Sequence, residues 1–180
     1  AEKHGAAFAQ GLPNPYRTVD GWAQLPGGRR MGAVGGLKVD PDGKSVWAVV
    51  RCEALDDPAR FGNECVDSKV DPILKFSPEG KVVKSFGSGM FIWPHGIDVD
   101  REGNVWVTDA VSAQRVPKGD KRGQQVVKFS PEGKVLMTLG TPGVPGAGPD
   151  HLESPSDVVV AANGDIFVAD GHNETGNNRV

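Results

Sequence analysis

The chain has 180 residues, 38% of them hydrophobic, and a formal net charge of −3. This length is enough for one domain with a real core. The negative charge argues against a nucleic-acid-binding protein, and no apolar run approaches the length of a membrane span. The 25 glycines and 14 prolines, with little amphipathic-helix periodicity, predict an all-β protein of short strands and tight turns.

The first 30 residues contain no clear repeat, and we expect residues 1–30 to be either a lead-in or a segment that closes the fold. The first hairpin is predicted at "GGLKVDPDGKSVWAV", which begins at Gly35. Arg51 follows its buried-looking strand directly, so the guanidinium is expected at a face or a channel. There it would either clamp a carboxylate or pair with a neighbouring acid.

Cys52 and Cys65 are the only cysteines, and both lie in the polar stretch "RCEALDDPARFGNEC". With no other cysteine available, they allow one pairing, and we expect a disulfide that closes a loop. Such a bond indicates an exported protein, either secreted or periplasmic. The alternative is two free thiols in a cytosolic protein.

Two elements repeat along the chain. "KFSPEGKVVKSFGSG" from Lys75 recurs as "KFSPEGKVLMTLGTP" from Lys128. The first hairpin recurs as "HGIDVDREGNVWVTD" from His95 and as "SDVVVAANGDIFVAD" from Ser156. Each unit therefore contains two hairpins, and a repeated four-stranded unit is typical of a β-propeller blade.

The blades are predicted at about residues 31–91, 92–153 and 154–180, the last of them incomplete. Propellers close with roughly four to eight blades, because closure covers the sheet edges. Two and a half blades cannot close a ring. We expect the remaining blades to belong to a longer chain, with assembly of two copies as the alternative.

An imidazole at the start of a predicted strand is unusual. His95 stands between Pro94 and Gly96, where the innermost strand of the second blade begins. Because inner strands start at the central channel, three imidazoles at this position would form an open tetrahedral zinc site. The equivalent residues, Gly35 and Ser156, are poor ligands, so only some blades would contribute. Otherwise His95 simply lines the channel.

Other polar and aromatic residues have structural interpretations as well. Asp109 and Asp170 end matching strands, and we expect their carboxylates to accept hydrogen bonds that shape turns. His172 follows on a glycine- and asparagine-rich loop, where it would face a metal, a substrate or solvent. Four tryptophans are expected mainly to pack between blades, with sugar stacking as the alternative: Trp22, Trp47, Trp93 and Trp106.

At this point a family resemblance becomes specific. "VDREGNVWVTD" followed by "VVKFSPEGKVLMTLG" resembles an NHL repeat, a unit of six-bladed propellers. "WPHGIDVDREGNVWVTD", "GPDHLESPSDVVVAANGDIFVADG" and "MGAVGGLKVDP" resemble the peptidyl-α-hydroxyglycine α-amidating lyase family, from about Met31 to the end. The resemblance implies zinc and calcium in the channel and cleavage of peptidyl-α-hydroxyglycine to a peptide amide and glyoxylate.

The resemblance also implies roles for individual residues. His95 falls on the first zinc ligand, and the other two ligands would lie beyond the last residue. Leu37 and Ile97 fall on positions whose backbone carbonyls reach calcium. Arg51 falls on the catalytic arginine, and His172 occupies the place of the catalytic tyrosine, where it would act as the base.

The sequence departs from the family in two places. His172 is not a phenol, and its ordinary pKa is far lower. Glu153 and Asn173 stand where the family has a pair of cysteines. A carbon–nitrogen lyase acting on a small-molecule or peptide substrate is therefore weighed against two alternatives. One is a non-catalytic NHL propeller that binds a protein or peptide, and the other is a gluconolactonase-like hydrolase, which would need acidic or asparagine ligands at the inner strand starts.

Overall fold

The computed structural model describes residues 14–53, 64–172 and 176–180. Regular structure there consists almost entirely of strands, which confirms the predicted all-β class. The two helical segments within these residues are single 3-10 turns, and neither is long and apolar enough to cross a membrane. The elements are η1 (Pro26–Gly28), β1 (Val34–Val39), β2 (Val46–Val50), β3 (Ile73–Phe76), β4 (Val82–Phe86), β5 (Pro94–Val99), β6 (Val105–Asp109), η3 (Ala113–Arg115), β7 (Gln125–Phe129), β8 (Val135–Leu139), β9 (Pro155–Val160) and β10 (Ile166–Asp170).

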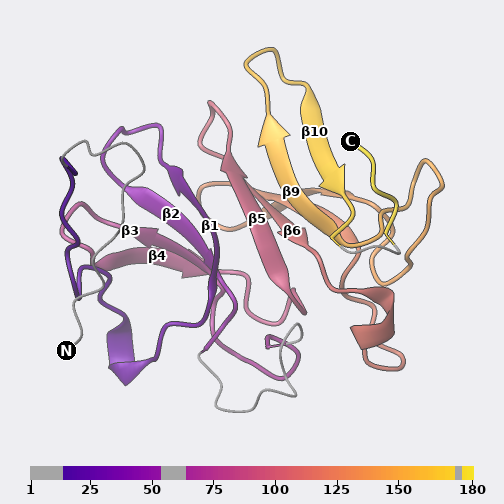
Figure 1. The fold of residues 1–180 in the computed structure, drawn as a ribbon, viewed down its shortest axis with the longest axis horizontal. Coiled ribbons are helices and arrows are strands. Elements are labelled where there is room, and N and C mark those ends of the chain that lie inside the picture. The colour runs from indigo at the N-terminus through magenta and orange to yellow at the C-terminus, as the bar shows by residue number, and fades with distance from the viewer. Residues whose placement is uncertain (1–13, 54–63, 173–175) are drawn as a thin grey trace.

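The strands form two four-stranded antiparallel sheets and one hairpin. The first sheet has the order β1-β2-β3-β4, the second β5-β6-β7-β8, and β9 pairs with β10. The first strands of the three units, β1, β5 and β9, lie side by side, and the sheets spread away from them like the blades of a fan (Figure 1). The chain is thus a partial propeller of two blades and the first half of a third.

A largely shielded polar contact explains the sequence repeat. Asp40, in the turn after β1, accepts a hydrogen bond from the indole of Trp47 at 2.7 Å and pairs with the ammonium group of Lys75 at 2.7 Å. It thereby joins the first hairpin of the blade to the second. The second sheet repeats these contacts at 3.1 and 3.2 Å with Asp100, Trp106 and Lys128.

Apolar side chains pack between successive blades. The core between the first and second sheets contains Trp47, Val49, Ile73, Phe86, Phe91, Ile97, Val105, Val107, Val127 and Phe129. A smaller cluster, centred on Trp106, Val126 and Val158, joins the second sheet to the hairpin. The two end faces of the partial propeller are only partly covered: Leu37 and Val39 are 64% and 59% exposed, and Phe167 is 50% exposed. These are the surfaces on which further blades are expected to pack.

Part of the predicted lead-in covers one of these end faces. Trp22, Leu25 and Met31 pack against the first sheet, and the indole of Trp22 donates a hydrogen bond to the carbonyl of Pro78 at 2.9 Å. A parallel bridge next to β4 joins Gln24 to Lys81. Residues 1–13 of the lead-in lie outside the described residues, and a role in closing the ring stays a prediction.

Candidate functional site

The inner strands approach so closely that only glycine fits at some positions. A Cβ atom added to Gly35 would lie 2.3 Å from the carbonyl oxygen of His95, and one added to Gly96 would lie 2.5 Å from Oδ1 of Asp157. Backbone therefore packs on backbone where β1, β5 and β9 begin. As predicted, the equivalent inner positions Gly35, His95 and Ser156 are neighbours in space.

These strand starts surround an open hollow of about 530 Å³. Four of the predicted site residues line it: His95, His172, Leu37 and Ile97. The other lining residues are Gly35, Gly36, Gly96, Ser156, Asp157 and Gly171. The fifth predicted residue, Arg51, does not line the hollow; its guanidinium lies over the ring of Trp93.

His95 is held in one orientation by the neighbouring strand. Its Nδ1 lies 2.9 Å from the carbonyl oxygen of Ser156, and a carbonyl can only accept, so Nδ1 carries the proton. Nε2 is then left with a lone pair. Burial, followed by the nearby charge of His172, lowers the pKa of His95, so the ring is neutral at neutral pH.

His172 reaches the hollow from the loop after β10. Its Nε2 lies 2.9 Å from Nε2 of His95, and the ring centroids are 4.5 Å apart. The ring is otherwise exposed to solvent. The two imidazoles are 77 residues apart in the sequence and touch only because adjacent blades pack side by side.

Trp93 is a site residue that sequence reasoning missed, because we expected it to pack between blades. Its ring makes edge contacts with His95 and His172, at centroid separations of 5.2 and 4.9 Å. The guanidinium carbon of Arg51 lies 4.2 Å above the same ring. A signal was present: Trp93 and His95 are two residues apart in an extended segment, so their side chains share one side.

Arg51 is fixed at the end of the first blade's second strand. Its backbone N–H donates to the carbonyl of Ala33 at 2.8 Å, and the guanidinium emerges over Trp93. Burial lowers the pKa of Arg51, and the negative charge of Glu64 opposes that shift. Arg51 thus lies over Trp93 with an acidic neighbour, and binding of a carboxylate by its guanidinium stays a prediction. Trp93 contacts both the Arg51 guanidinium and the two imidazoles at the hollow.

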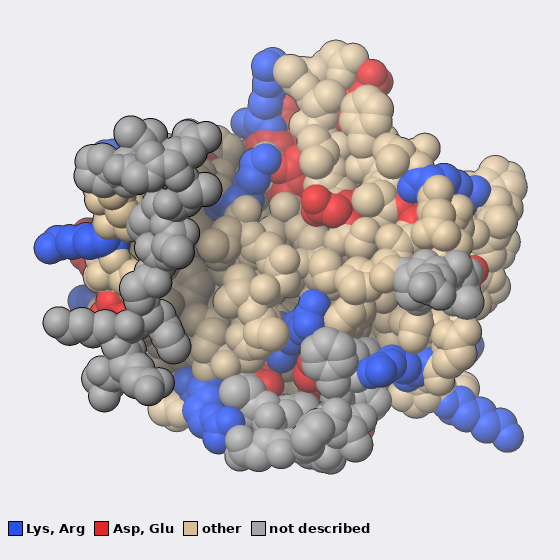
Figure 2. Space-filling model, in the orientation of Figure 1, with Lys and Arg blue, Asp and Glu red and all other residues tan. Residues whose placement is uncertain are grey.

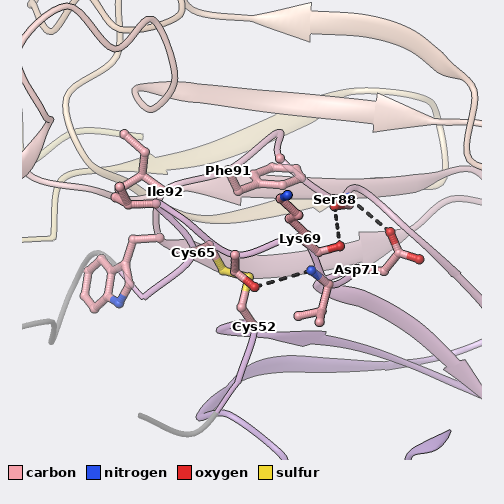
Figure 3. The surroundings of a disulfide bond; sticks show 12 residues. Cys52, Cys65, Lys69, Asp71, Ser88, Phe91 and Ile92 are labelled. Atoms are coloured by element: carbon pink, nitrogen blue, oxygen red, sulfur yellow. Dashed lines mark hydrogen bonds between the residues drawn. A yellow bond between two sulfur atoms is a disulfide. The ribbon is translucent and has the colours of Figure 1, made fainter. Parts of the chain in front are cut away.

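The predicted disulfide is formed between Cys52 and Cys65 and lies beside the segment that leads into β5 (Figure 3). The N–H of Cys65 donates to the carbonyl of Ile92 at 3.2 Å. Cys52 directly follows Arg51, and Ile92 directly precedes Trp93. The disulfide and this hydrogen bond together connect the segment next to Arg51 with the segment next to Trp93.

The two strand-ending aspartates hold the entry segments of their blades, as predicted. Asp109 is fully buried and accepts hydrogen bonds from the backbone N–H groups of Ile92 and Trp93, at 2.9 and 2.8 Å. Burial raises the pKa of Asp109 to about 6. Asp170 accepts a bond from the N–H of Glu153 at 2.6 Å. Asn173, at the other missing cysteine position, lies outside the described residues.

The zinc and calcium predictions depend on the donor atoms around the hollow. Among the described residues, no three His, Cys, Asp or Glu side chains are grouped closely enough to hold a metal ion. His95 and His172 form a pair whose nitrogens are suited to zinc. Leu37 and Ile97 line the same hollow, and calcium at their carbonyls stays a prediction. On the face of the molecule drawn in Figure 2, acidic and basic side chains are interspersed without a continuous basic surface.

Comparison with known proteins agrees with the predicted repeat. The NHL repeat family matches residues 152–180. A probable peptidyl-α-hydroxyglycine α-amidating lyase of Caenorhabditis elegans is 37% identical over 149 residues. The chain contains an NHL repeat and resembles the amidating lyases. Peptidyl-α-hydroxyglycine α-amidating lyase 2 of Drosophila melanogaster is 29% identical to this chain over 177 residues.

The chain spans about two fifths of the length of these relatives. Their matches cover 80% and 91% of this chain but 40% and 39% of the worm and fly proteins. Among solved structures, a gluconolactonase from Xanthomonas campestris aligns with a TM-score of 0.47 and 18% identity, covering 78% of this chain and 36% of that one.

Proposed function

We propose that the chain forms part of a metal-dependent, lyase-like propeller that acts on peptidyl-α-hydroxyglycine or a related small hydroxy-acid amide. The observation that carries the proposal is the contact between His95 and His172 at the hollow, with Trp93 touching both imidazoles and Arg51 stacked on Trp93, so that residues of three blades meet there. The names of the similar worm and fly proteins support the same reaction class.

The proposed reaction requires few protein groups. The substrate loses its hydroxyl proton, the oxygen forms a carbonyl with the α-carbon, and the carbon–nitrogen bond breaks. The nitrogen keeps the bonding electrons and takes up a proton, so the products are an amide and glyoxylate, with no water consumed. The protein must hold the carboxylate, accept one proton and supply one.

Arg51 is suited to hold the substrate carboxylate. A guanidinium offers two parallel N–H donors to a carboxylate, and stacking on Trp93 fixes the plane in which they point. The hydroxyl proton needs a base, and His172 is the candidate from the sequence. Its position beside His95 allows either that role or a part in holding the metal.

The donors present fit zinc. His95 would hold it through Nε2, because Nδ1 is committed to the carbonyl of Ser156. A bound zinc ion supplies a Lewis acid next to the substrate's hydroxyl or carboxylate oxygen. Calcium is proposed at the backbone carbonyls of Leu37 and Ile97, where oxygen donors suit a hard cation.

The proposal places the protein in an oxidising compartment, either secreted or periplasmic. The Cys52–Cys65 bond supports this location, since disulfides persist outside the reducing cytosol. A small-molecule or peptide substrate would reach the hollow from its open side.

The test is an assay of the full-length protein with a peptidyl-α-hydroxyglycine, in which glyoxylate and amide are measured together with bound metal. We expect equal amounts of the two products and a zinc-class metal in the protein. Arg51→Gln should raise KM for the carboxylate substrate by at least about tenfold. A full-length protein that binds no metal and releases no glyoxylate would contradict the proposal and favour a non-catalytic NHL propeller that binds a peptide or protein.

A further inference from the structure

We infer that His172 is a metal ligand beside His95, so that the Nε2 atoms of two imidazoles from adjacent blades hold one divalent ion of the zinc class. The inference rests on the proposed function, and it assigns His172 to the metal instead of to proton transfer. The residue would then supply a nitrogen where the amidating lyases, by resemblance, have a phenol.

The tautomer of His95 leaves its second nitrogen with a lone pair that can accept a hydrogen bond or bind a metal ion. Since Nδ1–H donates to the carbonyl of Ser156, the Nε2 lone pair points away from the strand toward His172. A ligating histidine in a metal site almost always has this arrangement, with the other ring nitrogen donating to a carbonyl or carboxylate. His95 is therefore already oriented as a ligand.

The Nε2 atoms of the two rings are close to the separation that a shared ion requires. They lie 2.9 Å apart, and the ring planes meet at 71°. A tetrahedral zinc ion with zinc–nitrogen bonds of roughly 2.0–2.1 Å would hold the two nitrogens about 3.3–3.4 Å apart, so a shift of about half an ångström would admit the ion.

The loop that carries His172 is built to direct it into the hollow. Gly171 has a φ of +147°, a value that side chains disfavour, so glycine lets the chain turn immediately after β10. Asp170 anchors the strand end by pairing with Arg179 at 3.0 Å. His172 itself is exposed, and its ring can shift by tenths of an ångström to suit the ion.

The environment favours a nitrogen-loving ion. Imidazole nitrogens suit zinc, copper, iron or nickel, whereas magnesium and calcium prefer oxygen. Two ligands leave the remaining positions for water, substrate or groups outside the described residues. That open coordination is what a catalytic ion needs.

The experiment is a Zn²⁺ titration of the full-length protein, in competition with a chromophoric chelator, for the unaltered protein and for His172→Gln, His95→Gln and His151→Gln. His151 is the matched control, because it is an imidazole on a different loop. We expect His172→Gln and His95→Gln each to weaken Zn²⁺ binding by at least about tenfold and His151→Gln to leave it unchanged. X-ray absorption at the zinc edge of the unaltered protein should show at least two imidazole ligands.

The outcomes separate the inference from the proposed function. If only His95→Gln weakens binding, or if absorption shows a single imidazole, the ligand role of His172 is wrong while the metal-dependent function stands. If the unaltered protein binds no Zn²⁺, or if His95→Gln leaves the affinity unchanged, the metal assignment at this hollow fails, and the inference fails with it.

Discussion

The close approach of the inner strands can be tested with a single methyl group. In Gly35→Ala the added Cβ would lie 2.3 Å from the carbonyl oxygen of His95, which is backbone and cannot rotate away. Overpacking of this kind costs about 1–3 kcal/mol or more, against about 0.4–1 kcal/mol gained from a less flexible unfolded chain. We expect a net loss of about 2 kcal/mol in the free energy of unfolding, or about 4–8 °C in Tm for a chain of this size.

Gly36→Ala is the matched control in the same strand. Its Cβ would meet Cγ2 of Ile97 at 3.0 Å and the backbone nitrogen of Ile97 at 3.4 Å, a milder overlap than the one at Gly35. We expect this variant to stay within about 0.5 kcal/mol of the unaltered protein. Urea unfolding of both variants gives the comparison, and Gly35→Ala should also weaken Zn²⁺ binding, because it displaces His95. If the two variants are equally stable, the inner strands do not pack as described.

Three further predictions concern the groups around the site. Burial in the folded protein raises the pKa of Asp109 to about 6, so the free energy of unfolding of the protein should fall by up to about 3 kcal/mol as pH rises from about 4 to about 6. Urea unfolding of Asp109→Asn should show no such pH dependence. Replacing Cys52 and Cys65 by serine should cost about 3 kcal/mol, given their separation of 13 residues; equal melting curves with and without reductant would contradict this. Trp93→Leu should raise KM for the carboxylate substrate with a smaller change in kcat, because Arg51 loses its stacking surface; an unchanged KM would show that stacking does not position Arg51.

The sequence predicted the blades because their design is local and repeated. In the first two units the turn of the first hairpin supplies an aspartate, a tryptophan follows it six or seven residues later, and a lysine begins the repeated "KFSPEGK" segment, as at Asp40, Trp47 and Lys75. Turn residues and strand patterns depend on neighbours in sequence, so reading them required no knowledge of how the sheets pack. The disulfide was predictable for a simpler reason, since two cysteines allow one bond.

The geometry of the site depends on contacts between blades, which no single segment encodes. His95 was identifiable from its place at a strand start, but its contact with His172 follows from the packing of β5 against β9. Trp93 was assigned to packing because an aromatic residue near a strand start usually serves that purpose. Only the stacked Arg51 above it shows that it links the arginine to the imidazoles.

The central claim is that inner positions of adjacent blades meet at one hollow and hold an ion there. Diffraction from crystals of the full-length protein grown with Zn²⁺, recorded on both sides of the zinc absorption edge, tests this directly. We expect an anomalous peak between Nε2 of His95 and Nε2 of His172. A peak elsewhere, or two imidazoles that face apart with no ion between them, would contradict it.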